Sequence, residues 1–207
     1  KYSNNFVGYD YINGKMFNDQ IKINLNNLLL FFKIKLWDKT TIKVNKKIFK
    51  EELHSFYFQK TNNRINEYIK NNKQFSDFNK INNIKINNIK KIIKKIDWNS
   101  LSSTSPTYIH GDLHFENILI SNNKIIALDI RNDFSKFKFI GDIYYDLSKI
   151  LHGIIVNHEI VNNNHFHYKK NKKSIQIEIS LSNDFYKNLK IFYDFCKKKN
   201  YNIKKIE

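Results

Sequence analysis

The sequence predicts an α+β domain that is mostly helical and carries one small β-hairpin. Two observations support this class. Two short apolar runs, 118–120 and 125–128, flank a polar turn at 121–124, which is the pattern of a hairpin. Elsewhere apolar residues recur at helical spacing, which is typical of amphipathic helices packed on a core. These helical segments are 19–37, 47–69, 81–96, 142–153 and 181–199.

Local patterns predict the elements of the first half. Aromatic and β-branched residues alternate loosely over 6–12 and end at Asn13-Gly14, which predicts a strand followed by a turn. The run at 28–32 fits the buried face of the first helix. The 47–69 helix has large apolar residues on or near one face, namely Phe49, Leu53, Phe56, Tyr57, Ile65 and Ile69. Isoleucine recurs throughout 81–96, which predicts another helix.

The second half begins with a polar linker over 100–107 that contains Pro106, the lone proline. The hairpin follows, and then a helix over 142–153 with apolar residues at helical spacing. Residues 157–174 are polar and rich in histidine, which predicts a loop. An aromatic helix over 181–199 closes the sequence.

The net charge of +17 comes from 36 Lys+Arg against 19 Asp+Glu. Such a balance can indicate nucleic acid, anionic lipid or anionic substrates. Lys, Asn and Ile dominate everywhere and no local basic block stands out, so a coding bias explains the charge better. The lysines of 81–96 are expected to form a solvated face. Nucleic acid is therefore an unlikely partner.

The cysteine count and the lengths of the apolar runs indicate the cellular compartment. Cys196 is the single cysteine, so there is no disulfide framework and a reducing cytoplasm fits. No apolar run approaches the roughly 18 residues that a membrane span needs. The sequence opens on Lys1 rather than Met, which suggests a fragment of a longer protein. Nothing indicates an oligomeric state.

Rare residues gather in one region. The chain has five glycines and only two arginines, Arg64 and Arg131. Gly111 and Gly141 bracket residues 112–140, and Arg131 lies two residues past Asp129. Because glycine marks a backbone that takes a positive φ or passes close to a neighbour, this region is a candidate site.

The same region carries three spaced polar groups in the segment His110-Gly111-Asp112 to Asp129. Asp112 lies in a loop, Asn117 five residues later, and Asp129 at the end of an apolar strand. Phosphoryl transfer from a Mg-nucleotide needs this set: a carboxylate that takes the proton of the acceptor hydroxyl, and an amide and a second carboxylate that hold Mg²⁺. A single Asp is more often a loop cap, but the whole set favours the chemistry.

These motifs resemble the carboxy-terminal lobe of the aminoglycoside phosphotransferase and choline kinase superfamily, which is related to protein kinases. The resemblance covers about residues 6–155. It implies a protein-kinase-like C-terminal lobe with Asp112 as catalytic base and His110 bracing the catalytic loop. It also implies Asn117 and Asp129 as Mg²⁺ ligands, and ATP and Mg²⁺ as cofactors.

The flanking segments extend the resemblance. Gly141 to Leu147 is similar to the family's Gly-Asp-x-x-x-Asp-Leu segment, so Asp142 and Asp146 are expected to give structural support, the first of them to the catalytic loop. Residues 9–14 resemble the hinge between lobes, which implies that Asp10, Tyr11 and Ile12 meet the adenine. Residues 1–14 are then the end of an N-lobe and hinge, and 15–207 the C-lobe. The phosphate-covering lobe is expected ahead of Lys1.

Four residues are candidates for binding the acceptor. Arg131 can clamp a phosphate or an anionic acceptor, or pair with a nearby Asp. Lys60 and Arg64 lie one turn apart on one helix face, where they can line an anionic acceptor pocket or form a solvated face. His114 can touch acceptor or phosphate, or pack within the loop. Tyr144, Tyr145, Phe134 and Phe137 suit core packing better than a cation cage.

The predicted function is an ATP-dependent phosphotransferase that acts on the hydroxyl of a small molecule. Aminoglycosides are polycations and would bind in a pocket lined by carboxylates. Few acidic residues of this chain lie outside the motifs, so such a pocket is not expected. A sugar or surface-glycan precursor is therefore favoured. The alternatives are a choline or amino-alcohol kinase, a catalytically inactive kinase-fold binding module, and, more weakly, a basic nucleic-acid binder.

Overall fold

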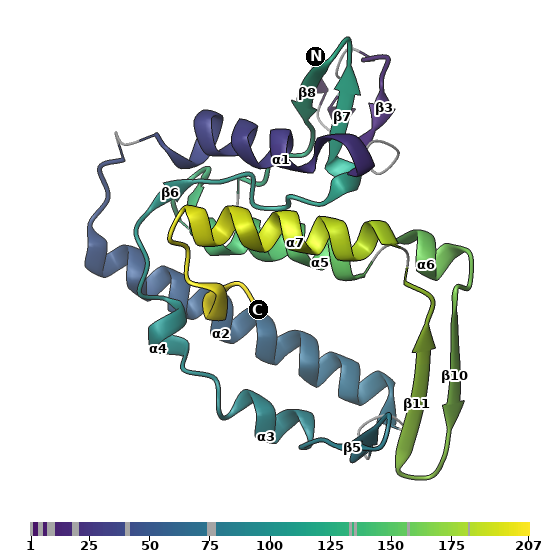
Figure 1. The fold of residues 1–207 in the computed structure, drawn as a ribbon. Coiled ribbons are helices and arrows are strands. Elements are labelled where there is room, and N and C mark those ends of the chain that lie inside the picture. Colours follow the sequence, from purple (N-terminus) through teal and green to yellow (C-terminus); the bar gives the residue numbers. More distant parts are fainter. Residues whose placement is uncertain are drawn as a thin grey trace.

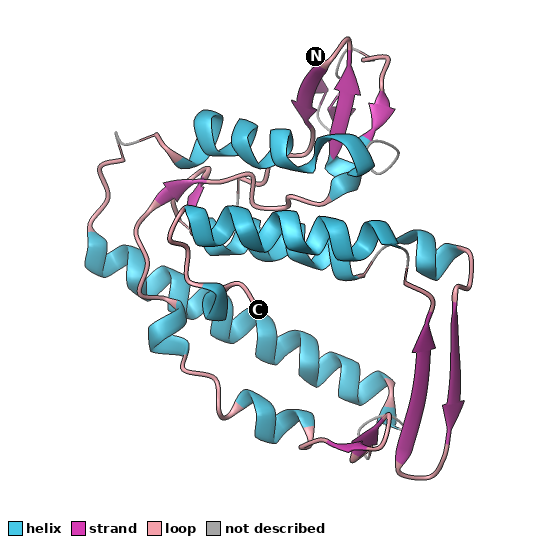
Figure 2. Ribbon diagram, viewed as in Figure 1, coloured by secondary structure: helices cyan, strands magenta, loops and turns pink. Residues whose placement is uncertain are grey.

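The computed structural model of the protein describes residues 2–3, 6–7, 11–17, 21–39, 42–73, 78–132, 134, 136–156, 158–181 and 183–207. The predicted α+β class is confirmed, because helices alternate with short strands along the chain (Figure 2). Among the described residues, none of the helices has both the length and the apolar character that crossing a membrane requires.

The elements up to residue 101 are mostly helical. In chain order they are β1 Tyr2–Ser3, β2 Phe6–Val7, β3 Lys15–Met16, α1 Ile21–Phe32, which continues into a π-helical turn Lys33–Trp37, α2 Lys46–Asn71, β4 Lys80–Ile81, β5 Ile84–Lys85, α3 Ile89–Ile93 and α4 Trp98–Leu101.

The elements after residue 101 contain the candidate site. In chain order they are β6 Thr107–Tyr108, a 3-10 turn Phe115–Asn117, β7 Ile118–Ser121, β8 Lys124–Ala127, β9 Ile140–Gly141, α5 Ile143–Ile155, α6 His158–Asn162, β10 Phe166–Lys170, β11 Ser174–Ile179, α7 Asn183–Lys198 and a 3-10 turn Ile203–Lys205.

The predicted hairpin is confirmed as β7 and β8. Ile118 pairs with Ala127 in antiparallel register, and β3 adds a third strand on the other side of β7. The turn residues Asn122 and Asn123 both have positive φ, 48° and 60°. Two consecutive residues in this conformation match the twist of a two-residue hairpin, and asparagine tolerates it better than most residues.

Two apolar clusters pack on either side of the 110–117 loop. The larger cluster joins α1, α5 and α7, which lie side by side (Figure 1), and it takes in Leu113 and Phe115 from the loop. The smaller cluster joins Phe49 and Leu53 of α2 to Ile109, the residue just before the loop. The loop is thus anchored by buried side chains at both ends, which fixes its position relative to α2 and α5.

The helix expected over 81–96 is wrong for its first half. Residues 80–85 form the β4–β5 hairpin, and only Ile89–Ile93 are helical. Asn82 and Asn83 have φ of 48° and 67°, so the chain turns back on itself there. The recurring isoleucines fit both periods, and the Asn-Asn pair is the local signal that favours the hairpin.

The loop expected over 157–174 is also wrong. It contains α6 and β10, and β10 pairs with β11 from Phe166↔Ile179 to Lys170↔Ile175. β11 in turn pairs in parallel with β4, which gives the sheet order β10-β11-β4-β5. The side chain of Asn82 links the β4–β5 turn to β11. It donates a hydrogen bond to Ile177 O at 2.8 Å and accepts one from Ile177 N at 2.6 Å.

Of the other expected elements, the helices are confirmed and the first strand is confirmed in part. The strand predicted over 6–12 is confirmed only at β2, and Tyr11–Ile12 are not in a strand. The helices predicted over 19–37, 47–69, 142–153 and 181–199 are confirmed as α1 with its π-helical turn, α2, α5 and α7. Residues 8–10, which include the predicted adenine contact Asp10, lie outside the described residues.

Candidate active site

Asp146 holds the start of the 110–117 loop. Its side chain is fully buried and accepts hydrogen bonds from the backbone N–H groups of His110 and Gly111, both at 2.9 Å. The indole of Trp37 donates a third hydrogen bond at 3.0 Å. Burial raises the pKa of Asp146 to about 6, against these three donors, so the side chain is a carboxylate at neutral pH.

Asp142 acts on α5 and α2 rather than on the loop. Its Oδ1 caps α5 by accepting from Tyr144 N at 3.1 Å, and its Oδ2 accepts from Tyr57 Oη at 2.9 Å. Burial raises the pKa of Asp142 to about 6. The resemblance had assigned loop support first to Asp142, and the backbone contacts with the loop come from Asp146 instead.

Two of the rare glycines meet close neighbours. Gly111 has φ of +78°, and a Cβ there would lie 2.8 Å from Arg131 Cβ. A Cβ on Gly141 would lie 2.3 Å from Ile109 Cδ1 and 2.7 Å from Phe134 Cδ1. No other residue type fits either position without displacing its neighbours. The glycines therefore bring Arg131 and Phe134 tightly against the loop.

Asp112 forms a three-membered polar cluster with Lys149 and His114. Its Oδ1 lies 3.0 Å from Lys149 Nζ and 3.4 Å from His114 Nε2, and the two nitrogens are 2.9 Å apart. Partial burial raises the pKa of Asp112, but the hydrogen bond and charge of Lys149 outweigh it, so the pKa lies below its ordinary value. Burial and Lys149 lower the pKa of His114. At neutral pH Asp112 is therefore an ionised acceptor beside a neutral imidazole.

His110 lies buried beneath this cluster. Its Nδ1 accepts from the backbone N–H of Asp112 at 3.3 Å, and its ring meets Phe32 edge-on with centroids 6.1 Å apart. Burial lowers the pKa of His110, which favours the neutral ring that such an acceptor nitrogen requires. His110 thus contacts the backbone of Asp112 rather than its carboxylate.

Asn117 connects the loop to the hairpin. Its side-chain Nδ2 donates to the backbone oxygen of Asp112 at 2.9 Å, and its backbone oxygen accepts from Leu128 N at 2.8 Å. The second contact continues the β7–β8 ladder and brings Asp129, the next residue after Leu128, beside the loop. Because the amide nitrogen is engaged, the Asn117 amide oxygen is the atom left to face a cation.

Asp129 has an exposed side chain and φ of 52°. A non-glycine residue in the left-handed region is uncommon, and such positions cluster at functional sites where the surrounding structure holds them. Asp112 and Asp129 both act electrostatically on His110, the first residue of the 110–117 loop. The structure thus brings together the neighbourhoods of all three predicted oxygen donors.

The predicted acceptor residues approach the site from two sides. Arg131 donates its backbone N–H to His110 O at 2.8 Å, so it lies directly against the loop. Lys60, on α2, donates to Tyr145 Oη at 2.8 Å. Arg64 is exposed one turn further along α2 and acts electrostatically on Lys60. The structure therefore gathers these three side chains, together with His114, around the loop.

The predicted adenine contacts are partly described. Tyr11 is 91% exposed and Ile12 is 41% exposed. Just after them, Asn13 O accepts from Ser121 Oγ at 2.6 Å. A Cβ on Gly14 would lie 2.7 Å from Ile120 O. The 11–14 segment therefore runs close against β7 and leaves Tyr11 and Ile12 uncovered beside the hairpin.

Lys149 is the site residue that the sequence interpretation missed. It is one of many lysines and belongs to no motif. The available signal was its spacing: Lys149 lies three residues after Asp146 on α5, and positions three apart share a helix face. Asp146 faces the loop, so Lys149 faces it too. The core packing expected for the aromatic residues of this region is confirmed, because Phe134 is buried with its ring centroid 4.9 Å from that of Tyr145.

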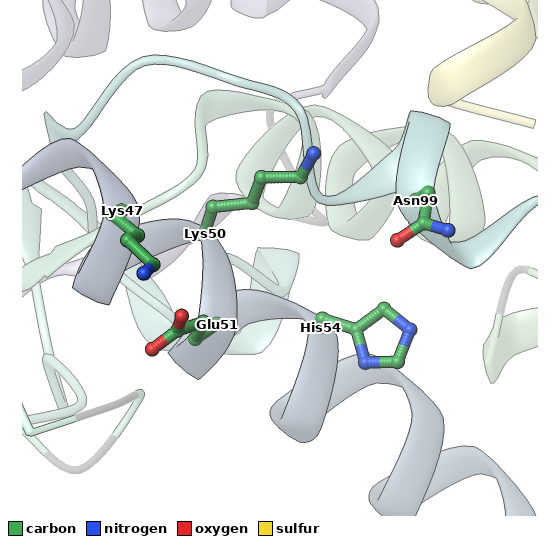
Figure 3. Close-up of a pocket in the computed structure, with 5 residues that line it drawn as sticks. All are labelled: Lys47, Lys50, Glu51, His54 and Asn99. Atoms are coloured by element: carbon green, nitrogen blue, oxygen red, sulfur yellow. The ribbon is translucent and has the colours of Figure 1, made fainter.

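Two cavities are found among the residues that the structure describes. The larger, about 570 Å³, opens between α2 and α4, where Lys47, Lys50, Glu51 and His54 of α2 face Asn99 of α4 (Figure 3). A smaller cavity of about 280 Å³ lies behind Tyr145, between α2, α5 and the last residues of the chain. Neither of these two cavities is lined by Asp112, Asn117 or Asp129.

No protein-family model matches the chain, and neither a curated protein nor a solved structure matches it. The assignment of function consequently depends on the chemistry of the residues around Asp112.

The Lys149–Asp112 contact predicts a change in pH dependence. In Lys149→Met we expect the pKa of Asp112 to rise, because the cation that favours its charged form is gone. For the predicted role of Asp112 as base, which requires the ionised carboxylate, the acid limb of the pH–rate profile should move to higher pH. The measurement is kcat from about pH 2.5 to 8, because the pKa of Asp112 in the wild-type protein lies below the ordinary value of an Asp. Lys149→Arg, which keeps the charge, and Lys190→Met, at an exposed position of α7, should leave the limb in place. An unmoved limb in Lys149→Met would refute the coupling.

Proposed function

We propose that the protein is an ATP-dependent phosphotransferase that acts on the hydroxyl of a small molecule, built on a protein-kinase-like C-terminal lobe. The observation that carries the proposal is the Asp112 carboxylate. It is held ionised by Lys149 at 3.0 Å, and it is linked through Asn117 to a hairpin that ends at Asp129. A base and two oxygen donors in one place are the parts that phosphoryl transfer needs.

Asn117 and Asp129 fit a magnesium ion. Mg²⁺ prefers oxygen ligands and is held in nucleotide sites by one or two carboxylates plus the phosphates. Asn117 offers its amide oxygen, because its nitrogen donates to Asp112 O. Asp129 offers an exposed carboxylate at the end of β8. A bound Mg²⁺ neutralises charge on the transferring phosphoryl group.

Asp112 accepts the proton of the acceptor hydroxyl as the hydroxyl oxygen bonds to the terminal phosphorus of ATP and the bond from that phosphorus to ADP breaks. Lys149 keeps Asp112 ionised and supplies positive charge where phosphoryl oxygens gather. His110 and Asn117 fix the backbone of Asp112 from both sides. Tyr11 and Ile12 offer an uncovered segment next to the hairpin for the adenine.

The proposal is tested with the full-length protein, including whatever residues the coding sequence places ahead of Lys1. Asp129→Asn should lower Mg²⁺-dependent ATP turnover by about 10²-fold or more, because a carboxylate ligand is lost. Its affinity for Mn²⁺, read by electron paramagnetic resonance, should fall in parallel. Asp194→Asn, at an exposed position on α7, is the matched control and should change neither.

Three outcomes would contradict the proposal or one of its parts. Nucleotide binding with no turnover by the wild-type protein would favour the inactive binding module. Equal turnover by wild type and Asp129→Asn would remove Asp129 from the metal site. Transfer to choline in preference to sugars would replace the sugar acceptor with an amino alcohol.

A further inference from the structure

Four cations from three parts of the chain gather around Tyr145, which lies within electrostatic range of Asp112, and they are called the basic cluster. Lys60 and Arg64 come from α2, Arg131 from the segment after β8, and Lys149 from α5. Tyr145 lies at their centre. Lys60 Nζ donates to its hydroxyl at 2.8 Å, and Lys149 Nζ lies 5.7 Å from its ring centroid.

Contacts on the aromatic side hold Lys60 in this place. Its Nζ lies 4.4 Å from the ring centroid of Phe56 and 5.1 Å from that of Tyr145. Both rings belong to the packed layer that includes Phe134, whose centroid is 4.2 Å from that of Phe56. Lys60 is consequently half-buried and fixed, unlike a lysine on a solvated helix face.

The charges of the basic cluster repel one another. Burial, and after it the charges of Arg131, Arg64 and Lys149, together lower the pKa of Lys60 to about 8, with Asp112 opposing them. Positive potential is thus concentrated next to the predicted base. A cluster of this kind attracts an anion and disfavours a cation.

Composition bias does not explain the basic cluster. Lysine is abundant throughout the chain, but the chain has only two arginines. Arg64 and Arg131 are 67 residues apart in sequence, and both act electrostatically on Lys60 and on Tyr145. Arginine is the residue suited to forked recognition of phosphate and carboxylate oxygens.

We propose that the acceptor carries an anionic group, a phosphate or a carboxylate, which Lys60, Arg64 and Arg131 bind so that a free hydroxyl of the same molecule reaches Asp112. This inference rests on the proposed phosphotransferase function and narrows its substrate to anionic sugars and similar hydroxylated anions. Lys149 stays paired with Asp112 at 3.0 Å and serves the base rather than the acceptor anion. Choline and aminoglycosides, which are cations, are excluded as acceptors.

Sulfate binding tests the anion site without turnover. Sulfate keeps its double charge across the neutral range, and binding is measured by isothermal titration calorimetry on the full-length protein. Arg64→Gln and Lys60→Met should each weaken binding about tenfold or more, the size expected for a charge-assisted hydrogen bond of about 1.5–3 kcal/mol. Lys70→Met, at an exposed position of the same helix, should bind like wild type. Equal affinity in all four proteins would overturn the proposal.

The same titration in the presence of saturating Mg-AMP-PNP separates the acceptor anion from the nucleotide phosphates. Retained sulfate binding supports an acceptor site. Displacement of sulfate would assign the basic cluster to the terminal phosphate of ATP and overturn the proposal.

The binding affinities of four small molecules show whether the anionic group of the acceptor is a phosphate or a carboxylate. Glucose 6-phosphate or glucuronate should bind at least about tenfold more tightly than glucose or choline, and the tighter of the two anions identifies phosphate or carboxylate. Equal affinity for glucose overturns the anionic acceptor. Transfer to neutral sugars without sulfate binding would leave the phosphotransferase standing and remove this inference alone, whereas sulfate binding without any transfer would remove the phosphotransferase.

Discussion

Asp112→Asn should reduce phosphoryl transfer by about 10²–10⁴-fold, the contribution of a positioned general base. The amide cannot take the hydroxyl proton, and it cannot attract Lys149 as the carboxylate does at 3.0 Å. Because Asp112 is partly exposed, the variant should fold with little loss of stability. The reduction should appear in kcat, with KM for ATP changed little, since the proton moves only as the transition state forms.

The measurement is steady-state transfer with radiolabelled ATP on the full-length protein. Asp194→Asn is the control for an Asp-to-Asn change far from the loop, and it should keep wild-type kcat. Near-normal turnover by Asp112→Asn would show that another group takes the proton and that the role assigned to Asp112 is wrong.

Asp146→Ala should destabilise the protein by at least about 3 kcal/mol. The change leaves His110 N, Gly111 N and the indole N–H of Trp37 without their acceptor. Each buried donor left unpaired costs about 1–3 kcal/mol, and the fully buried side chain also leaves a cavity. Urea unfolding monitored by tryptophan fluorescence and far-ultraviolet circular dichroism gives the free energy of unfolding.

The matched control is Asp194→Ala, an exposed position whose replacement should stay within about 0.5 kcal/mol of wild type. A loss below about 1 kcal/mol in Asp146→Ala would mean that water or another acceptor replaces the carboxylate. In that case the packing of the two apolar clusters would be enough to hold the 110–117 loop in place.

Local pattern predicted much of the fold. The hairpin at 118–127 and helices α1, α2, α5 and α7 follow from apolar period and turn residues, which act over a few neighbours. The β4–β5 and β10–β11 hairpins were missed although each pairs locally, because the isoleucines of 81–96 fit both helix and strand and the polar composition of 157–174 favoured a loop. The parallel pairing of β11 with β4 joins residues about 95 positions apart, and such a tertiary contact leaves no mark on a short window of sequence.

Apart from Lys149, the sequence indicated which residues belong to the candidate site, but not how those from separate helices meet. Asp112, Asn117 and Asp129 lie within one short segment, so the chain itself brings them close. Loop support was expected from Asp142 but comes from Asp146, because spacing alone does not tell which carboxylate faces the loop and which caps the helix. Lys149 and the meeting of Arg64 with Arg131 depend on how α2 and α5 pack, which is a property of the whole core.

The parallel pairing of β11 with β4 also constrains how the polypeptide acquires its structure. β4 and β5 are two residues each, and a two-stranded ribbon of that size is marginal in water. Their third strand is β11, more than ninety positions later. Closing so long a connection is entropically costly and slow relative to helix formation, so this sheet is set to assemble late. During synthesis, residues 80–85 cannot form their stable sheet until the ribosome has released β11, with which β4 pairs.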